Sequence, residues 1–349
     1  MPAELLTLTD LGFLPQTLVL RRSLDQVAPE TRLRVLAVDP RAAELLRARD
    51  DPRVTVVDAH DLEAGDPDLA GARAGRSRRE WCWTLTPAFC HAALQAAPAG
   101  ATLAWIDADI AFYRHPAELD HALGTASVLF VPHRYDRPFP ASASPGWLAD
   151  NYGALNGGTV VLRNDATGRW VAREWRQRTI GWCHDRIEPE RYGNQRFLEP
   201  LAALLGVRTA KSIGIGLAPW NVGRHTLSGT AGRPVADGTP AVFFHFQSLR
   251  LLARGRLPRR ALPANYLVPP NRSDADVVAR VSPWFRVTAE QRRLVWGPYL
   301  EQLLDEARGL GAAAHRWRRE LPRLRCSQLR ADWRIRLSLA AGRKRTVGG

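Results

Sequence analysis

Several features that would place this chain in an obvious class are missing from its sequence. No stretch approaches the roughly 18 uninterrupted apolar residues of a membrane-spanning helix. The N-terminus, MPAELL, lacks the basic segment and apolar run of an export signal. The four cysteines show no paired metal-binding spacing. We therefore expect a cytoplasmic protein with free thiols and no transmembrane segment.

Lysine is also scarce, since only Lys211 and Lys344 accompany the arginines. Together with abundant alanine this indicates a GC-rich genome, so the choice of Arg over Lys is not evidence of function. The net charge of +14 is unevenly distributed: residues 1–250 hold 28 Lys and Arg against 27 Asp and Glu, which leaves 21 basic and 8 acidic residues in 251–349. The first 250 residues do not have the composition of a nucleic-acid-binding protein, and we expect no such partner.

Short apolar runs alternate with segments of helical period over most of the 349 residues. This alternation predicts an α/β protein with helices on both faces of a doubly wound sheet. The predicted strands are Leu5–Thr9, Arg34–Val38, Val54–Val57, Leu103–Ile106, Ala126–Pro132, Gly158–Leu162 and Ala241–Phe246. The predicted helices are Pro15–Gln26, Pro40–Ala48, Thr86–Ala97, Gly168–Ile180 and Asn194–Leu205, and Glu63–Arg79 is predicted to be a surface loop.

Asp107 and Asp109 follow directly after the apolar run Leu103–Ile106, which predicts a buried strand. Ligands of doubly wound sheets bind outside the carboxyl ends of the strands. Burying a carboxylate without a partner is costly, and a hard divalent cation shared with a phosphate-bearing substrate is the usual solution. The alternative is that the two aspartates only end the strand and cap the next helix, and a motif this short does not decide between the two interpretations.

Two later motifs could complete a site with these aspartates. Asn156, Gly157 and Gly158 precede a strand, where glycine lets the backbone approach a ligand closely and the amide can bind hydroxyls. A tight hairpin turn is the alternative. His245 lies in the middle of an apolar strand, where it is either a core residue or a third metal ligand, and imidazole suits Mn²⁺ better than Ca²⁺.

Two further pairs combine polar side chains in a way that suits sugar binding. Asn194 could cap a helix, while its neighbour Gln195 could reach a bound sugar from the helix start. Trp220 and Asn221 place an indole and an amide side by side, a combination suited to stacking on the face of a sugar.

The order of these motifs resembles that of the GT-A-fold glycosyltransferases, in particular the bacterial nucleotide-diphospho-sugar transferase group related to the glycogenin-like glycosyltransferase family. The resemblance runs from about Leu5 to Arg250, and each motif is weak alone. The resembling segments are LLTLTDLGFLPQTLVLRRSL, EWCWTLTPAF, WIDADIAF, LNGGTVVLRN, IGWCHDRIEPERYGNQRFLEP, LAPWNV and FFHFQ. The resemblance implies a GT-A (Rossmann-like) domain over residues 1–250, with a mixed, mostly parallel sheet flanked by helices. Residues 251–349 would form a basic, mainly helical extension.

The resemblance also implies an activity and a set of site residues. The chain would move a sugar from a nucleotide-diphosphate donor to a glycan or glycolipid acceptor, with retention of configuration at the anomeric carbon. It would act in the assembly of a bacterial polysaccharide. Asp107, Asp109 and His245 would hold Mn²⁺ or Mg²⁺ against the donor diphosphate, where negative charge develops. The residues assigned to donor binding are Thr7, Thr9, Asp10, Asp107, Asn156, Gly157 and Arg250, and those assigned to catalysis are Asn156, Asn194 and Gln195.

Two positions depart from the pattern of that family. Asn194 stands where the family usually has an aspartate, so that sugar choice could differ or activity could be weak. Ser248 and Arg250 stand near the Gly and Lys that contact the diphosphate in the family, and Arg250 could serve with a different geometry.

Two other functions are compatible with such a fold. A nucleotidyltransferase would need a Gly-rich basic loop after the first strand, and Leu11-Gly12-Phe13-Leu14 is neither Gly-rich nor basic. A non-catalytic relative that binds sugar or a protein partner is not excluded by the residues, because of Asn194.

The C-terminal region predicts two helical segments. Trp284–Leu303 is expected to pack as a small appendage. In Ala312–Leu339 arginines are interleaved with Trp317, Leu321, Leu324, Leu329, Trp333, Ile335 and Leu337. A basic helix of this kind favours peripheral attachment to an anionic membrane surface, on the inner face of the cell membrane. The alternative is a basic helix that packs on its own domain.

Overall fold

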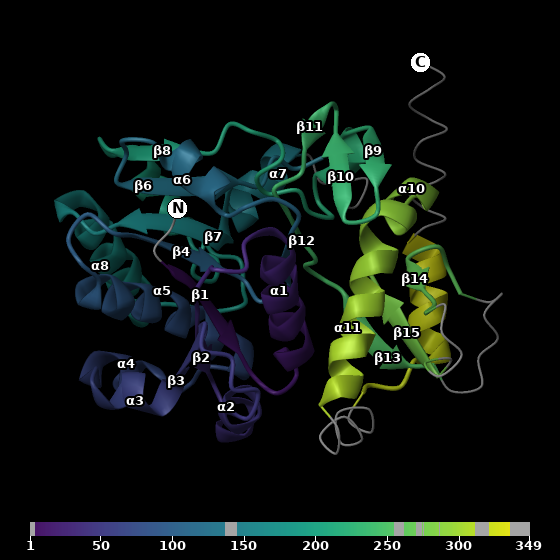
Figure 1. Cartoon of the computed structure of the whole chain (residues 1–349), viewed down its shortest axis with the longest axis horizontal. Helices are drawn as coiled ribbons and strands as arrows, with labels where there is room; N and C mark the ends of the chain where they lie inside the picture. Colours follow the sequence, from purple (N-terminus) through teal and green to yellow (C-terminus); the bar gives the residue numbers. More distant parts are fainter. Residues whose placement is uncertain are drawn as a thin grey trace.

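A seven-stranded sheet forms the centre of the chain in this computed structural model (Figure 1). The structure describes residues 4–136, 145–254, 262–269, 274, 276–285, 287–310 and 321–335. The strands of the sheet are β1 Glu4–Thr9, β2 Leu33–Ala37, β3 Val54–Asp58, β4 Thr102–Ile106, β6 Val128–Pro132, β7 Leu155–Arg163 and β8 Val207–Thr209. Their order is β3-β2-β1-β4-β7-β6-β8, and all neighbours are parallel except β7, which is antiparallel to both β4 and β6. The predicted α/β fold with a mixed, mostly parallel sheet is confirmed.

Helices cover both faces of this sheet, as the alternating pattern predicts (Figure 1). They are α1 Leu14–Val27, α2 Pro40–Arg47, α3 Ala59–Ala64, α4 Pro67–Ala72, α5 Arg78–Ala96, α6 Ala117–Leu123, α7 Pro145–Tyr152, α8 Ala166–Gly181 and α9 Leu198–Ala202. Successive residues of β1 point to opposite faces: Leu5 packs in the core under α1, and Leu6 packs in the core under α5 and α8. The apolar strands are therefore buried on both sides, which explains their continuous hydrophobic runs.

Two predicted segments differ from the structure. Glu63–Arg79 is not one surface loop, because Asp66 caps α4 through the Leu69 N–H (3.1 Å) and α5 begins at Arg78. The predicted helix Asn194–Leu205 is shorter, since α9 spans only Leu198–Ala202. Short polar segments of this kind carry their helix signals in the capping residue and not in a hydrophobic period.

Two small antiparallel sheets formed by residues before Arg250 lie beside the main one. The first joins β5 Ile110–Phe112 to β12 Phe243–His245. The second contains β9 Leu227–Thr230, β10 Arg233–Ala236 and β11 Thr239–Pro240, and is preceded by the short helical turn η1 Val222–Arg224. The β5–β12 pair adjoins the Asp107–Asp109 motif, because β5 begins directly after Asp109 and β12 ends at His245.

The residues after Arg250 share a core with the rest of the chain. They contain β13 Arg250–Ala253, β14 Tyr266–Leu267, β15 Val277–Arg280, α10 Ala289–Gln291, the π-helical segment Arg292–Trp296 and α11 Gly297–Gly309. Helix α11 lies beside α1 (Figure 1), and the Tyr299 ring stacks on Phe246, with 3.5 Å between ring centroids. The sequence predicted the helices but not the three-stranded sheet β13-β15-β14. The proposed division at residue 250 stays a prediction.

The basic segment Ala312–Leu339 is described only in part, because Trp317 and Leu337 lie outside the described residues. Residues 326–335 are helical, and Leu324 and Leu329 are buried in a small core with β13, β14 and β15. This part therefore packs on its own domain, while Trp333 is 44% exposed. No helix in the described part of the chain is long and apolar enough to span a membrane.

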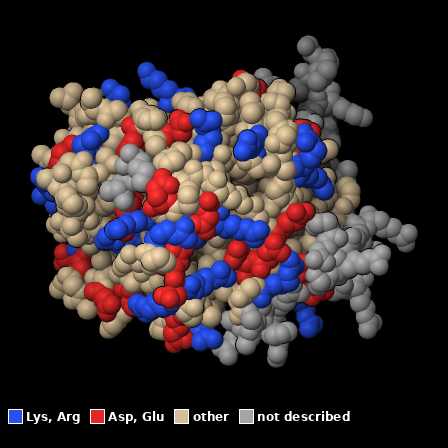
Figure 2. All heavy atoms as spheres, viewed as in Figure 1, with Lys and Arg blue, Asp and Glu red and all other residues tan. Residues whose placement is uncertain are grey.

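Contact of this segment with an anionic membrane surface stays a prediction. Figure 2 shows acidic side chains among the basic ones over the face in view, and several arginines of the described residues form ion pairs, among them Arg22, Arg49, Arg280 and Arg308.

Asp332 fixes this helix to the sheet and gives a test of the packing. Its carboxylate is almost fully buried and accepts hydrogen bonds from Arg280 (2.7 Å), Tyr266 (2.9 Å) and Asn265 (3.3 Å). Asp332→Asn leaves the Arg280 guanidinium without its counter-charge, so we expect a loss of about 2–3 kcal/mol in the free energy of unfolding, measured by urea denaturation. The exposed Arg330→Ala on the same helix should change it by less than about 0.5 kcal/mol. Equal effects of the two variants would contradict this packing.

Candidate active site

Two antiparallel pairings determine where Asp107 and Asp109 lie. Between β4 and β7, the Asp107 N–H donates to the Gly158 carbonyl (2.9 Å), so Asp107 faces the glycines at the start of β7. Between β5 and β12, Ile110 lies opposite His245. The Phe246 N–H donates to the Asp109 carbonyl (2.7 Å). Strands far apart in the sequence are thereby brought to one carboxyl edge of the sheet.

The structure brings together the three residues that were expected to hold a metal. His245 Nε2 lies 3.0 Å from Asp109 Oδ1 and 3.6 Å from Asp107 Oδ2. One ligand atom from each of the three residues lies within 4.8 Å of the others. His245 is therefore not an apolar core residue remote from the carboxylates. Two carboxylate oxygens and an imidazole nitrogen are a donor set that suits Mn²⁺.

The electrostatics of this cluster favour a bound cation. Although 38% of the Asp107 side chain is exposed toward the pocket, burial by the surrounding protein raises the pKa of its carboxyl to about 6; His245 opposes this shift and Asp109 adds to it. Burial alone would lower the pKa of His245, but Asp109 and Asp107 raise it above its ordinary value. The two carboxylates thus favour positive charge at this position, which a bound cation would supply.

Glycine at 157 and 158 is required by close approach. A Cβ at Gly158 would lie 2.5 Å from Asp107 Oδ2 and 2.7 Å from His245 Cε1. A Cβ at Gly157 would lie 3.0 Å from the Gln195 Cβ and 3.1 Å from Asn194 Oδ1. The two glycines are therefore not a hairpin turn, because they lie within β7 and let the strand contact both groups of predicted site residues.

The three amides assigned to catalysis all line one pocket with Asp107. Asn156 Oδ1 accepts from the Gly158 N–H (2.9 Å), and its Nδ2 lies 3.2 Å from His245 Nδ1. Asn194 Nδ2 donates to the Trp83 carbonyl (3.0 Å), and Gln195 Nε2 donates to a backbone carbonyl of α7. Each amide is thus fixed by the protein, and their assignment to catalysis stays a prediction.

Other predicted donor-binding residues lie away from this pocket. Thr7 and Thr9 have fully buried side chains. The Thr9 hydroxyl accepts a hydrogen bond from the Thr17 hydroxyl of α1 (2.8 Å). Their positions do not support contact with a nucleotide. Arg250 lies exposed at the start of β13 and is not among the described residues that line the pocket. Asp10 is partly exposed and is held by the Phe13 N–H (2.9 Å).

Sequence reasoning missed Asp39 and Arg78, which stand beside Asp10. Asp39 follows β2 and caps α2 through the Ala42 N–H (2.9 Å), and Arg78 lies 3.0 Å from Asp39 and 3.2 Å from Asp10. Asp39 comes directly after the predicted strand Arg34–Val38. This position could have identified it, since neighbouring parallel strands end at the same edge of a sheet.

The pocket beside the metal-ligand cluster has a volume of about 270 Å³. Six large aromatic rings line it: Trp83, Tyr135, Tyr152, Tyr192, Trp220 and Phe285. Trp220 was expected to contact sugar, whereas its neighbour Asn221 is buried and fixes the loop through the carbonyls of His133 and Gly216 (2.8 Å each). A larger hollow of about 690 Å³ between Arg178 and Glu199 is lined by none of the predicted residues among those described.

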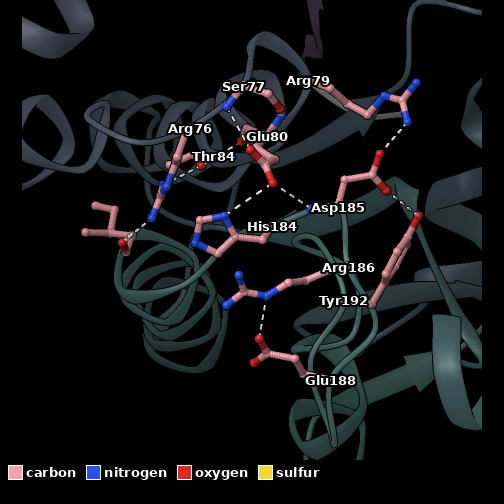
Figure 3. A network of polar contacts seen from close by, with 11 residues as sticks. Arg76, Ser77, Arg79, Glu80, Thr84, His184, Asp185, Arg186, Glu188 and Tyr192 are labelled. Atoms are coloured by element: carbon pink, nitrogen blue, oxygen red, sulfur yellow. Dashed lines mark hydrogen bonds and ion pairs between the residues drawn. The ribbon is translucent and has the colours of Figure 1, made fainter.

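The loop that carries Tyr192 and Asn194 is attached to the first turn of α5 (Figure 3). Glu80 accepts from the backbone N–H groups of Ser77 (2.7 Å) and Asp185 (2.8 Å), and lies 3.2 Å from His184 Nδ1. Asp185 in turn accepts from the Tyr192 hydroxyl (3.1 Å). Burial on its own would raise the pKa of Glu80, but these hydrogen bonds lower it to about 2. The carboxylate of Glu80 therefore holds one wall of the pocket.

The chain has relatives among known proteins. The sheet order, the Asp107–Asp109 turn and the β5–β12 pair define a mixed α/β fold with an acidic cluster at the carboxyl edge of its sheet. No family model matches the chain. The uncharacterized protein YfnD of Bacillus subtilis (strain 168) is 33% identical over 235 residues, which cover 66% of this chain and 72% of YfnD. The chain belongs to the same family as YfnD.

Other similarities to known proteins are weaker. The uncharacterized protein YfnF of Bacillus subtilis (strain 168) is 27% identical over 249 residues, 71% of this chain and 82% of YfnF. The crystal structure of the galactosyltransferase LgtC with donor and acceptor sugar analogs has a TM-score of 0.47 at 17% identity, over 91% of this chain and 100% of LgtC. Mouse xyloside xylosyltransferase 1 has a TM-score of 0.45 at 13% identity, over 71% and 98%. Likenesses this low assign the chain no activity.

The Glu80 contacts predict how stability depends on pH. Because the pKa of Glu80 falls from 4.5 to about 2 on folding, its stabilising effect is complete above pH 4.5 and is lost as the pH falls toward 2. The difference in urea midpoint between the wild type and Glu80→Gln should therefore shrink on acidification from about pH 6 to about pH 3. The exposed Glu301→Gln serves as control and should show no such convergence. A constant difference would contradict the role of the carboxylate.

The crowding at Gly158 predicts the effect of one added methyl group. Gly158→Ala should displace Asp107 or His245 and weaken Mn²⁺ binding about 10- to 100-fold, measured by isothermal titration calorimetry. Gly181→Ala is the matched control, because a Cβ there meets nothing within 4 Å. Mn²⁺ affinity that is equal in the two variants would show that the cluster does not bind the metal.

Proposed function

We propose that this chain is a metal-dependent glycosyltransferase that moves a sugar from a nucleotide-diphosphate donor to a saccharide or lipid-linked acceptor. One observation carries the proposal: Asp107, Asp109 and His245 meet at the carboxyl edge of a mixed sheet, beside an aromatic pocket. Hard-cation ligands at this edge are suited to a phosphate-bearing substrate. The resemblance of the ordered motifs to GT-A glycosyltransferases supports the same conclusion.

The cluster would hold Mn²⁺ or Mg²⁺. When bound, the metal would neutralise charge on the leaving nucleoside diphosphate. The chain supports this role through rigid ligands: the Trp105 indole N–H donates to Asp107 Oδ1 (3.0 Å), and Asn156 lies against the far nitrogen of the His245 ring. Fixed partners of this kind orient metal ligands.

The nucleoside would lie at the carboxyl ends of β1 and β2, where Asp10, Asp39 and Arg78 meet. Gly157 and Gly158 allow the donor to approach the strand closely. Asn156, Asn194 and Gln195 would bind hydroxyls of the donor sugar, since an amide offers both a donor and an acceptor. Arg250 would need to swing toward the diphosphate from its exposed position on β13.

We infer retention at the anomeric carbon. Asp107 is the one carboxylate among the described residues that line the pocket, and it belongs to the metal cluster. An inverting displacement would need a general base for the acceptor hydroxyl, and no carboxylate besides Asp107 is available for this among the described lining residues. Asn194, in the place where relatives usually have an aspartate, is neutral. A non-catalytic sugar-binding protein is the competing proposal, and it predicts metal and sugar binding without turnover.

The decisive experiment is a screen for turnover. Purified chain with Mn²⁺ is incubated with UDP-, GDP- and dTDP-sugars, and released nucleoside diphosphate is measured. We expect hydrolysis of at least one donor, lost on addition of EDTA. Asp109→Asn should lower this rate on the order of 100-fold or more, because a ligand of the metal is removed.

The matched control is Asp61→Asn, an exposed aspartate on α3, which should leave the rate unchanged. No hydrolysis of any donor, combined with intact Mn²⁺ binding, would support the non-catalytic alternative. Hydrolysis that persists in EDTA would overturn the assignment of the metal.

A further inference from the structure

His133, which no prediction assigned, is held rigidly at the end of β6. Its backbone N–H donates to the Ala154 carbonyl (2.8 Å), and its own carbonyl accepts from the Asn221 amide (2.8 Å). The ring nitrogen Nδ1 lies 3.0 Å from the Gly153 carbonyl. A carbonyl can only accept, so Nδ1 carries the proton and Nε2 keeps its lone pair.

That lone pair is free to meet a ligand. Nε2 has no hydrogen-bond partner within the ranges that the structure describes, and His133 lines the same pocket as Asp107 and Asn156. The residue as a whole is 5% exposed, so it does not lie on the open surface. Burial lowers the pKa of His133 to about 3, which keeps the ring neutral and an acceptor of hydrogen bonds.

His133 belongs to an aromatic wall that begins at the metal-ligand cluster. The Trp220 ring meets His245 edge-on with 5.2 Å between centroids, and meets His133 edge-on at 5.1 Å. The Tyr135 ring stacks on His133 at 4.7 Å, with an interplanar angle of 12°. His133 is therefore connected to His245 of the cluster through the Trp220 ring.

Further aromatic rings line the same pocket. Tyr192 meets Tyr152 edge-on with 4.8 Å between centroids, and it contacts Trp83 at 5.8 Å in a tilted arrangement. No Lys or Arg is found among the described residues that line the pocket. A carboxylate or phosphate bound beside His133 would be withdrawn from water without a cationic side chain from the described lining, which is unfavourable. Neutral sugar rings suit such a pocket, because their apolar faces pack on aromatic rings and their hydroxyls need only a few polar partners.

We propose that the part of the pocket lined by His133, Tyr135 and Trp220 is the acceptor subsite, that it takes a neutral saccharide, and that His133 Nε2 accepts a hydrogen bond from an acceptor hydroxyl. This inference rests on the proposed glycosyltransferase function and names the class of its acceptor. His133 orients the hydroxyl and does not retain its proton. By the same charge argument we expect acidic sugars and phosphorylated acceptors to bind more weakly than neutral ones.

The test measures saccharide binding independently of turnover. The full chain with Mn²⁺ and UDP is titrated with the methyl glycosides of glucose, galactose and mannose, and with methyl glucuronide and glucose 1-phosphate as charged probes. Saturation-transfer difference NMR reports the affinity of each. We expect at least one neutral glycoside to bind and to displace neither Mn²⁺ nor UDP, and we expect the charged probes to bind more weakly.

Two substitutions of His133 separate its acceptor atom from its structural role. His133→Asn can keep a donor toward the Gly153 carbonyl but lacks an atom at the position of Nε2, so it should bind the neutral glycoside about tenfold more weakly. His133→Gln can place an amide oxygen near that position and should recover part of the affinity. Mn²⁺ binding in each variant verifies that the pocket floor has folded, and His121→Asn on the exposed side of α6 is the matched control.

Three results would overturn the proposal: unchanged affinity in His133→Asn, preference for the charged probes, or no binding of any neutral glycoside. The proposed glycosyltransferase function is tested separately in the same samples. If that function is wrong, Mn²⁺ and UDP do not bind, while the binding of the glycosides can still be measured.

Discussion

The approach of two carboxylates, Asp107 and Asp109, is the constraint on which the rest of the site depends. Their backbone is fixed from both sides, by β7 before the turn and by β12 after it. Like charges this close oppose each other, and partial burial strengthens the repulsion. His245 relieves it from the third side. A site with this balance is arranged for a cation before any substrate arrives, which is why the cluster is the strongest indication of function.

The C-terminal region takes part in holding this arrangement. Phe246, directly after His245, stacks on Tyr299 of α11, and Trp296 meets both Phe244 and Phe246 edge-on. These rings lie in one buried core with residues of β12 and of the loop before it. The position of His245 therefore depends on helices that follow it by some fifty residues. A boundary drawn between catalytic and appended parts at residue 250 passes through this shared core.

Much of the fold could be predicted from the sequence because its strands are apolar runs buried on both faces. The Asp107–Asp109 pair, the glycines and His245 could be identified as candidates for the same reason, since each interrupts or ends such a run. Their distances could not be predicted, because antiparallel register between distant strands sets them. The burial of Thr9 under α1 depends on packing that one strand does not reveal. The sheet formed by β13, β14 and β15 escaped prediction because its strands have only two to four residues.

The distribution of charge connects the surface to the choice of substrate. The chain carries a net charge of +14, yet the described lining of the pocket holds no Lys or Arg. Several arginines of the described residues are instead paired with carboxylates, as Arg78 is with Asp10 and Asp39, and Arg79 with Asp185. A cation held by Asp107 and Asp109 would therefore be the source of positive charge beside the described lining. On the proposed function the metal would serve the donor, and the aromatic end of the pocket would select its ligand by shape and hydroxyl pattern and not by charge.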